Sequence, residues 1–371
     1  MKPEKDGGSM TTPLLTWREL RCIPVSVPLA NPVRTASGEV KHAPLILLDL
    51  LTEEGIVGKA YLFTYSPLVL KPLIGLLDEL NSQLVGVTVA PVELERVLDA
   101  RFRLLGNTGL VTMALAGIDM ACWDALARAA GLPLYRLLGG MHKPVAGYFS
   151  QGMDGLEKAV SLAEQCVERG FTLMKIKIGY QTAEEDLAVV RAVLSILGDR
   201  AELAVDYNQS LSVPEALRRC HRLDELSLAW IEEPTRYDDD TGHALITREI
   251  RTPIMLGENW FGSHAMARSV TARASDLVMP DLMKIGGVSG WLRAAGIADA
   301  ARLPMASHIF QEITAHLMTV TPTGLRLEIL ELADPILTRP LHVSNGMAYP
   351  NTDSGNGLNW NEQVVERLRI T

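Results

Sequence analysis

TLMKIKIGY, residues 172–180, has the composition of a buried β-strand, yet it contains two lysines. Because successive side chains of a strand point to opposite faces, Lys175 and Lys177 share one face. The opposite face carries only apolar side chains, which are Met174, Ile176 and Ile178. A lone Lys-x-Lys most often marks a solvated face of a sheet. Only the surrounding sequence can indicate whether these two ammonium groups lie inside the protein instead.

Similar short apolar runs recur from about residue 144 onward, separated by amphipathic helical stretches such as residues 154–170 and 184–199. The eight runs are VAGYFS, LMKIKI, LAVDYN, LAWIEEP, PIMLGEN, LVMPDL, PMASHI and LRLEIL. A repeated strand–helix unit predicts a parallel sheet, and eight parallel strands close most simply into a barrel. An open doubly wound sheet is the alternative, but no Gly-x-Gly-x-x-Gly follows the first strand.

The chain before this repeat predicts a second domain. Residues 14–60 alternate as strands do, with a hairpin turn at residues 53–55, and residues 68–137 follow a helical period. Strands followed by helices indicate an α+β domain. We therefore divide the chain into a disordered polar leader (1–13), an α+β domain (14–143), a barrel (144–331) and a loop-rich segment (332–371) that packs back on the first domain.

The composition excludes several kinds of partner. The 371 residues carry a net charge of -9 and no basic run, which argues against nucleic acid and against an anionic membrane surface. No run of 18 or more uninterrupted apolar residues is present, and the leader lacks the apolar core of a signal peptide. The four cysteines are far apart, as expected for reduced thiols in a cytoplasmic protein.

An ionisable residue ends most of the apolar runs of the repeat. In chain order these residues are Lys177, Asp206, Glu232, Glu258, Asp281, His308 and Glu328, each about one strand–helix unit after the last. In a barrel, the carboxyl ends of the strands build the active site. One such residue alone is more simply a helix cap or a solvated loop residue. Seven in register predict that they converge on one catalytic mouth.

Asp206, Glu232 and Glu258 come from three successive strand ends. Three converging carboxylates without a cation would repel one another and raise their own pKa values. Oxygen ligands without cysteine or histidine suit a hard cation, so we expect Mg²⁺, with Mn²⁺ as the alternative and zinc disfavoured. Asn208 lies on the same strand face as Asp206 and is expected to support it with a hydrogen bond.

The same carboxylates would offset the charge of two inward-facing lysines one strand earlier. Lys175 and Lys177 should lower each other's pKa, and the cation should lower both further. We expect Lys175 to stay charged and Lys177 to lose its proton and act as a general base.

The remaining strand ends offer acid–base groups on the other side of the mouth. Asp281 and His308 end neighbouring strands, so the carboxylate could fix the imidazole tautomer. Glu328, with leucines on both sides in LRLEIL, is expected to keep its proton and to donate a hydrogen bond to a developing oxyanion. A salt bridge from Glu328 to Lys284 or to another cation is the alternative.

Several stretches resemble the enolase superfamily, and specifically its mandelate racemase subgroup. In the barrel these are KIKIG, VDYNQS, WIEEPT, GENW, MPDLMKIGGVSGW, ASHIFQE and TPTGLRLE; in the first domain they are VPLANPVRTASG, YLFTYSP and GIDMACWDAL. The resemblance covers nearly the whole chain after the leader. It implies a modified (β/α)7β barrel, an α+β capping domain completed by residues 332–371, an essential Mg²⁺ and a homo-octamer.

The resemblance also implies a role for each residue of the mouth. The metal ligands would be Asp206, Glu232 and Glu258. Lys177 would remove the α-proton of the S enantiomer, and His308, paired with Asp281, would act on the R enantiomer. Lys175 would neutralise the substrate carboxylate, and Glu328 would be the electrophilic acid. These roles agree with those inferred from the residues themselves.

A substrate pocket is implied between the two domains. Its lining would be Val33, Ser37, Val40, Phe63 and Tyr65 from the cap, and Ser150, Asn208, Ile309 and Leu330 from the barrel. This mostly apolar lining suits an aryl group better than a polyol. The chain departs from the subgroup at Ser37, where the subgroup has valine, at Asn31, where it has tyrosine, and at FSQG (149–152), where it has DSHS. Ser150 is retained and could bind the substrate carboxylate.

Two bases on opposite faces of one carbon predict racemisation through an enediolate. The expected activity is that of a mandelate racemase-like isomerase acting on mandelate or a related aryl or apolar 2-hydroxy acid. The main alternative is dehydration of an acid sugar by the same bases. A cycloisomerase and a metal-stabilised binding protein are further alternatives.

Overall fold

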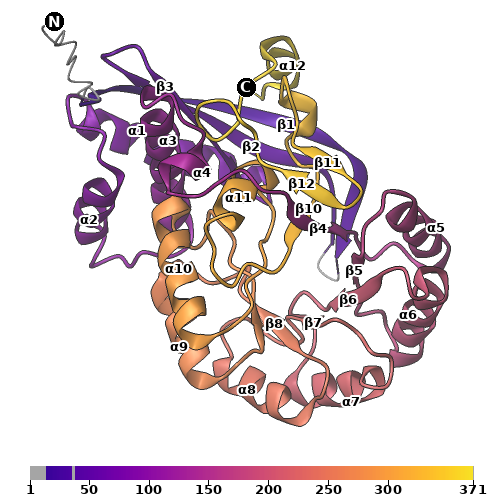
Figure 1. The fold of residues 1–371 in the computed structure, drawn as a ribbon. Coiled ribbons are helices and arrows are strands. Elements are labelled where there is room, and N and C mark those ends of the chain that lie inside the picture. Colours follow the sequence, from indigo (N-terminus) through magenta and orange to yellow (C-terminus); the bar gives the residue numbers. More distant parts are fainter. Residues whose placement is uncertain (1–13, 36–37, 371) are drawn as a thin grey trace, which may run out of the picture.

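The computed structural model describes residues 14–35 and 38–370, so the expected leader and Ser37 lie outside the described residues. Figure 1 shows an indigo sheet lying across one end of a ring of helices, with the yellow C-terminal segment beside it. This is the expected combination of a modified TIM barrel with an N-terminal α+β capping domain.

The cap is a three-stranded antiparallel sheet backed by helices. Its strands are β1 (Trp17–Thr35), β2 (Gly38–Thr52) and β3 (Val57–Phe63), paired in the order β1-β2-β3. The hairpin turn covers residues 53–56, which include the predicted residues 53–55, and Gly55 has a positive φ of 82°. The helical elements are η1 (Pro67–Val69), α1 (Leu70–Leu84), α2 (Pro91–Arg101), α3 (Leu110–Ala129) and α4 (Leu134–Leu137).

Helix α3 is the core helix of the cap. It is long and apolar enough to cross a membrane by length and composition, but 78% of its most apolar window is buried inside the protein. It packs on β3 and on the barrel helix α10 (Gly287–Ala301). Its apolarity is therefore accounted for by packing between the two domains.

The contact between β3 and α3 depends on the missing side chain of Gly58. A Cβ at Gly58 would overlap the carbonyl oxygen of Ala121 and lie 2.8 Å from the Cβ of Ala125. The strand and the helix can approach this closely only because no side chain separates them.

Gly58→Ala is therefore expected to lower the free energy of unfolding by about 1–3 kcal/mol through overpacking. Gly75→Ala is the matched control, because nothing lies within 4 Å of its added Cβ on the exposed side of α1. It should stabilise the protein by about 0.5–1 kcal/mol. Chemical denaturation of both variants provides the measurement, and equal effects would contradict the packing argument.

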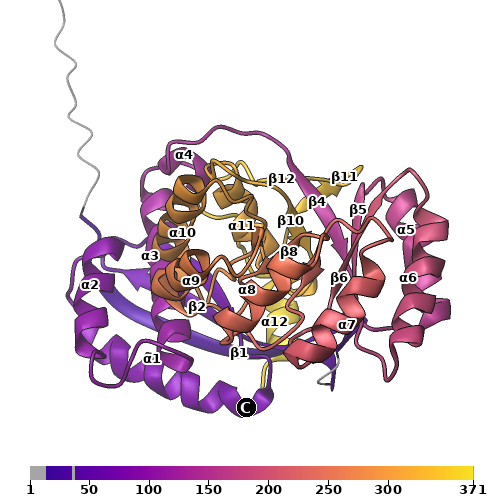
Figure 2. The same cartoon turned by 90° about the horizontal axis from the view of Figure 1, so that it is seen from below.

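The barrel alternates strands and helices in the (β/α)7β order. The strands are β4 (Val145–Ser150), β5 (Leu173–Lys177), β6 (Glu202–Asp206), β7 (Ile231–Glu232), β8 (Ile254–Leu256), β9 (Leu277–Val278) and β10 (Leu327–Ile329). The helices are α5 (Leu156–Glu168), α6 (Ala183–Leu197), α7 (Val213–Leu223), α8 (Asp240–Glu249), α9 (Gly262–Ala272), α10 and α11 (Gln311–Met318). The strands pair in parallel from β4 to β9, and β10 pairs with β4. Figure 2 shows the barrel helices arranged around these strands.

The seventh apolar run, PMASHI, is not a continuous strand. It joins its neighbours only through isolated bridges, including Val278 to Met305 and Asp281 to His308. Its last residue, Ile309, and the next residue, Phe310, have positive φ values of 39° and 51°, so the backbone turns out of the strand conformation. The run still occupies the position between β9 and β10, so the expected barrel order holds.

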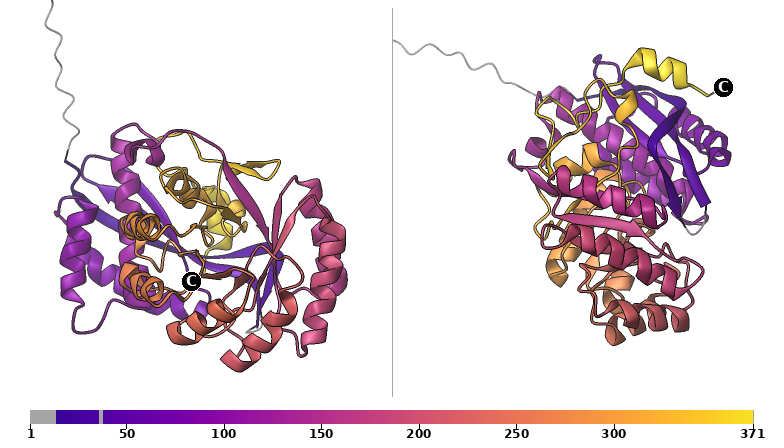
Figure 3. Two further views of the ribbon diagram at one scale, coloured as in Figure 1. Left: turned by 60° about the horizontal axis from the view of Figure 1, so that its bottom comes forward. Right: turned by 90° about the vertical axis from the view of Figure 1, so that its right-hand side faces the viewer.

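The C-terminal segment contacts both domains. It contains η2 (Asp334–Ile336), β11 (His342–Ser344), β12 (Met347–Tyr349) and α12 (Glu362–Leu368). After α12, the amide of Ile370 donates to the carbonyl of Pro24 at 2.9 Å, and Figure 3 shows α12 beside the indigo cap strands. The β11–β12 hairpin, which was not expected, pairs antiparallel with the start of β4. The segment thus extends the barrel sheet as well as covering the cap.

The two lysines of strand β5 lie inside the protein. Met174, Ile176 and Ile178 belong to the large core shared with the helices. Lys175 and Lys177 are also buried, but on the inner side, where the Lys175 ammonium lies 5.4 Å from the ring centre of Tyr148. The floor below them is a separate apolar layer of Tyr148, Leu173, Ala204, Trp230, Met255, Met279 and Ala306. The two lysines therefore face the barrel mouth.

Candidate active site

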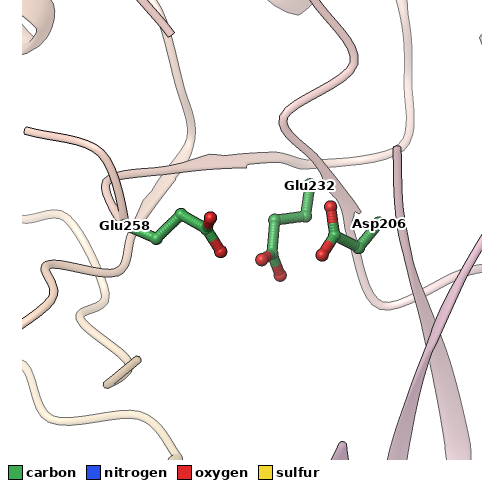
Figure 4. A group of neighbouring side chains, drawn as sticks. All are labelled: Asp206, Glu232 and Glu258. Carbon is green, nitrogen blue, oxygen red and sulfur yellow. The ribbon is translucent and has the colours of Figure 1, made fainter. Parts of the chain in front are cut away.

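The three predicted metal ligands lie together in the mouth of the barrel. Asp206 ends β6, Glu232 ends β7 as its register partner, and Glu258 follows β8. Each is buried and offers a carboxylate oxygen within 4.8 Å of the others. In Figure 4 the three carboxylates lie side by side and turn toward a common region. We refer to them below as the acidic triad.

Neighbouring groups hold the acidic triad in place. Asn208 donates to Asp206 through its backbone N–H at 2.7 Å and its side-chain amide at 3.0 Å, as expected. The Asn259 amide donates to Glu258 Oε1 at 3.1 Å. The other oxygen of Glu258, Oε2, is buried and accepts no hydrogen bond from the described residues, although it lies 3.2 Å from His308 Nε2. A carboxylate oxygen without a hydrogen bond, beside two further carboxylates, fits a hard cation.

The electrostatics of the acidic triad also indicate a cation site. Burial raises the pKa of Glu232 well above its usual range, and the nearby Asp206 carboxylate raises it further. Such repulsion is costly unless positive charge enters the cluster. Oxygen ligands without sulfur or nitrogen suit Mg²⁺ better than zinc.

The two lysines supply part of that positive charge. The Lys175 ammonium lies 3.0 Å from Glu232 and 2.8 Å from Glu328, and Lys177 pairs with Asp206. The expected lowering of the lysine pKa values is wrong for this arrangement. Burial lowers the pKa of Lys177, but the Asp206 carboxylate and its neighbours outweigh burial and raise it above the ordinary value. Burial lowers the pKa of Lys175, but Glu232 and Glu328 outweigh burial and raise it well above its ordinary value.

His308 and Asp281 form the expected pair. The His308 Nδ1 lies 2.8 Å from Asp281 Oδ2, and the other ring nitrogen lies 3.2 Å from Glu258. Asp281 is itself fixed by the backbone N–H of Lys284 at 2.8 Å and by the Tyr65 hydroxyl at 3.4 Å. Burial lowers the pKa of His308, but Glu258 and then Asp281 outweigh it, so the imidazole is more basic than usual.

Glu328 is surrounded by hydrogen-bond donors. It accepts from the Ser150 hydroxyl at 2.6 Å and from the Ile309 amide at 2.8 Å, and it pairs with Lys175. Burial raises the pKa of Glu328, but the Lys175 ammonium and the His308 ring outweigh burial and hold it below its usual range. In this arrangement the carboxyl is ionised.

The expectation that Glu328 keeps its proton is therefore wrong for this arrangement, and the alternative of a salt bridge is found. The partner is Lys175 rather than Lys284. The leucines that suggested an apolar site were misleading because the residues directly before and after Glu328, Leu327 and Ile329, project from the opposite face of β10. The groups that contact Glu328 on its own face are polar, namely the Lys175 ammonium and the Ser150 hydroxyl.

A cavity of about 350 Å³ opens above these groups, between cap and barrel. Every described residue predicted to line the substrate pocket lines it: Val33, Val40, Phe63, Tyr65, Ser150, Asn208, Ile309 and Leu330. Lys177, Glu258, His308 and Glu328 also reach its wall. Lys175, Asp206 and Glu232 are not among its lining residues, so they act from beneath it.

Sequence reasoning missed part of this wall. The additional lining residues are Leu29, Thr35, Gln151, Gln209, Asn259, Lys284 and Leu332. For two of them, the position in the sequence could have indicated a place at the mouth. Asn259 directly follows a predicted metal ligand, and Lys284 comes three residues after the predicted partner of His308. A polar residue that close to a strand end tends to lie at the same mouth.

This fold and this site together define a metal-dependent barrel enzyme. Residues 17–139 match the family described as the mandelate racemase/muconate lactonizing enzyme N-terminal domain, and residues 158–364 match the enolase C-terminal domain-like family. The chain therefore belongs to the mandelate racemase/muconate lactonizing enzyme family of the enolase superfamily. The expectation of this superfamily is confirmed.

Known relatives have different activities. A solved enolase from Bradyrhizobium, complexed with magnesium and mandelic acid, is 42% identical with a TM-score of 0.93 and covers 97% of this chain and 99% of its own. The L-talarate/galactarate dehydratase of Salmonella typhimurium is 28% identical over 93% of this chain and 89% of its own length. L-talarate dehydratase from Polaromonas, solved with magnesium and L-glucarate, is 28% identical with a TM-score of 0.86, covering 96% and 98%.

The magnesium in these structures and the acidic triad of this chain confirm the expected cofactor. The protein is a magnesium-dependent enzyme of the enolase superfamily. The relatives bind small acids, either mandelic acid or a sugar acid.

Proposed function

We propose that this protein removes the α-proton of a 2-hydroxy acid from one face and returns a proton to the other, and is therefore a racemase. The observation that carries the proposal is the cavity itself. Lys177 and His308 both line it, and they come from β5 and from the run after β9, on different sides of the barrel mouth. A substrate carbon between them would meet a base on each face. Lys177 would act on the S enantiomer and His308 on the R enantiomer.

The chemical difficulty is that an α-proton beside a carboxylate is barely acidic, because its removal leaves a dianionic enediolate. Magnesium at the acidic triad would supply positive charge to that dianion and reduce the field that keeps Lys177 protonated. Lys175 adds a second positive charge from below. A substrate carboxylate that binds Lys175 would compete with Glu328 for it. Glu328 would then lose its cation, its pKa would rise, and it could hold the proton that an oxyanion needs.

The apolar part of the cavity favours an aryl or apolar substrate. Val33, Val40, Phe63, Ile309 and Leu330 form much of its wall. Burial of a phenyl ring against such a surface is favourable, whereas burial of several hydroxyl groups there costs free energy unless each finds a hydrogen bond. The Bradyrhizobium relative holds mandelic acid, which is consistent with mandelate or a similar 2-hydroxy acid here.

Dehydration of an acid sugar is the second candidate, because the same wall has a polar part. Gln151, Gln209, Asn259 and Lys284 line it. These side chains could bind hydroxyl groups, and His308 could protonate a departing β-hydroxyl. Two of the relatives are dehydratases.

The test is to incubate each mandelate enantiomer with the enzyme and Mg²⁺ in D₂O and to follow optical rotation and α-deuterium by NMR. The racemase proposal expects loss of rotation and deuterium uptake from both enantiomers. Absence of exchange from either enantiomer would falsify it for mandelate. The same experiment on galactarate, with detection of a 2-keto product, tests the dehydratase alternative.

A further inference from the structure

Asp186 is a buried carboxylate that belongs neither to the acidic triad nor to the wall of the cavity. It lies in the first turn of α6, and only 1% of its surface is exposed. Burial of a carboxylate at this level is costly unless hydrogen-bond donors surround it. The donors that surround Asp186 therefore indicate which parts of the chain it holds in place.

One oxygen of Asp186 holds the turn that follows Lys177. Asp186 Oδ1 accepts from the backbone N–H of Gly179 at 2.9 Å and from that of Tyr180 at 2.8 Å. Gly179 has a positive φ of 111°, which residues with a side chain rarely adopt, and the turn directs two consecutive amides at one oxygen. Since β5 ends at Lys177, Asp186 fixes the backbone at the point where the chain leaves this strand.

The other oxygen of Asp186 reaches β6 and α7. Asp186 Oδ2 accepts from the Tyr207 hydroxyl at 3.3 Å and from the Arg219 guanidinium at 2.8 Å. Tyr207 directly follows Asp206 of the acidic triad. Arg219 also donates to the backbone carbonyl of Tyr180 at 2.9 Å, so the ion pair binds the turn after β5 through both an acceptor and a donor.

The ends of β5 and β6 are bound to each other. Lys177 and Asp206 are register partners, and the backbone N–H of Ile178 donates to the carbonyl of Asp206 at 2.8 Å. The Lys177 ammonium pairs with the Asp206 carboxylate. A shift of the turn that follows Ile178 would therefore displace both side chains.

We infer that Asp186 is a positioning residue, which holds Lys177 and Asp206 in place through the turn after β5 and through Tyr207. The part that concerns Lys177 rests on the proposed function, whereas the part that concerns Asp206 rests on the acidic triad alone. A displacement of about 1 Å between a base and its carbon can cost about 10²-fold in rate. Loss of the groups that orient a metal ligand typically costs about 10–100-fold in metal affinity.

Asp186→Asn tests the inference, because asparagine has the same shape but no charge and only one acceptor oxygen. That oxygen can serve either the two amides or the Arg219 side, but not both. Isothermal titration of the folded variant should show magnesium binding about tenfold more weakly than in the unaltered protein. At saturating Mg²⁺, the ratio of α-deuterium uptake from S-mandelate to uptake from R-mandelate should fall about tenfold, because His308 lies outside this network.

Two further variants separate positioning from support of the helix. If Asp186→Asn does not fold because Arg219 is left unpaired, Asp186→Asn combined with Arg219→Gln removes both charges and should show the same two losses. Glu185→Ala is the matched control. It removes the same charge from the same turn of α6, together with the capping bond from the Thr182 N–H at 2.8 Å. It should weaken the start of the helix and leave both measurements unchanged.

Two results would overturn the inference. One is an unchanged magnesium affinity in Asp186→Asn, whether or not mandelate is a substrate. The other is an unchanged ratio of S to R uptake at saturating Mg²⁺, since a general loss of structure affects both enantiomers alike. If the unaltered protein exchanges neither enantiomer, the proposed function has failed, and the magnesium titration alone decides the role of Asp186.

Discussion

Lys177→Met is expected to reduce racemisation by about 10²–10⁴-fold, the contribution typical of a positioned general base. Methionine has a similar shape but neither charge nor a basic atom. With Lys177 gone, the S enantiomer has no base on its proton-bearing face. The R enantiomer still meets His308, whose imidazole is held by Asp281 at 2.8 Å. Deuterium uptake from R-mandelate should therefore continue, while uptake from S-mandelate should stop.

His308→Asn should give the mirror result, with exchange retained only from the S enantiomer. The measurement is α-deuterium incorporation into each enantiomer by NMR. Lys143→Met is the surface control and should exchange both enantiomers at the normal rate. Because Lys177 contacts Asp206, the magnesium affinity of Lys177→Met must be measured as well, and saturating Mg²⁺ used. Loss of exchange from both enantiomers at saturating magnesium would contradict the assignment of Lys177 to the S enantiomer and of His308 to the R enantiomer.

Much of the fold could be predicted because β5 and its successors repeat a simple rule. Alternation along residues 173–178 separated the lysine face from the apolar face, and spacing by one strand–helix unit brought Asp206, Glu232 and Glu258 to one mouth. Both steps depend only on local geometry and on the regularity of a barrel. They hold whatever the details of side-chain packing.

The features that could not be predicted depend on distances between side chains. The pKa of Lys177 was expected to fall because of Lys175 and the cation, but the carboxylate of Asp206 is in direct contact with Lys177 and outweighs Lys175. The state of Glu328 was likewise decided by Lys175, which reaches it across the sheet from β5. Coulomb energies change steeply over a few ångströms, and sequence spacing does not resolve such differences.

Two other features were not predicted because they depend on pairing between distant segments of the chain. The β11–β12 hairpin lies among prolines and polar residues, and its strands of three residues each are too short to show a periodic pattern. It is stabilised by pairing with β4, a contact between segments about 200 residues apart in the chain. The run PMASHI had the composition of a strand, but the turn at Ile309 and Phe310 limits it to isolated bridges. In both cases the outcome depends on neighbours that the local sequence does not identify.

Removing magnesium with a chelator is expected to abolish α-proton exchange from both enantiomers and to lower the free energy of unfolding. The acidic triad then keeps three buried carboxylates within 4.8 Å of one another with only the lysines and His308 to offset them. Magnesium at about 100 times its dissociation constant should restore about 2.7 kcal/mol of stability, since it binds the folded state. Denaturation with and without Mg²⁺ provides the measurement.

Glu258→Gln should remove most of the stabilisation that magnesium provides. Its Oε2 accepts no hydrogen bond from the described residues, but it lies 3.2 Å from His308 Nε2. Burial raises the pKa of Glu258, but His308 and the nearby lysines outweigh burial and lower it to about 2, so replacing this carboxylate removes a group that its neighbours stabilise. Without Mg²⁺ the variant should be less stable than the unaltered protein at neutral pH, because a carboxylate with a lowered pKa contributes stability there, and Mg²⁺ should stabilise the variant much less. Glu312→Gln removes another buried carboxylate, one bound to Tyr61 rather than to the triad, and should keep the full magnesium response. If Glu258→Gln gains as much stability from magnesium as Glu312→Gln does, then Glu258 is not a ligand and the cation is held elsewhere in the mouth.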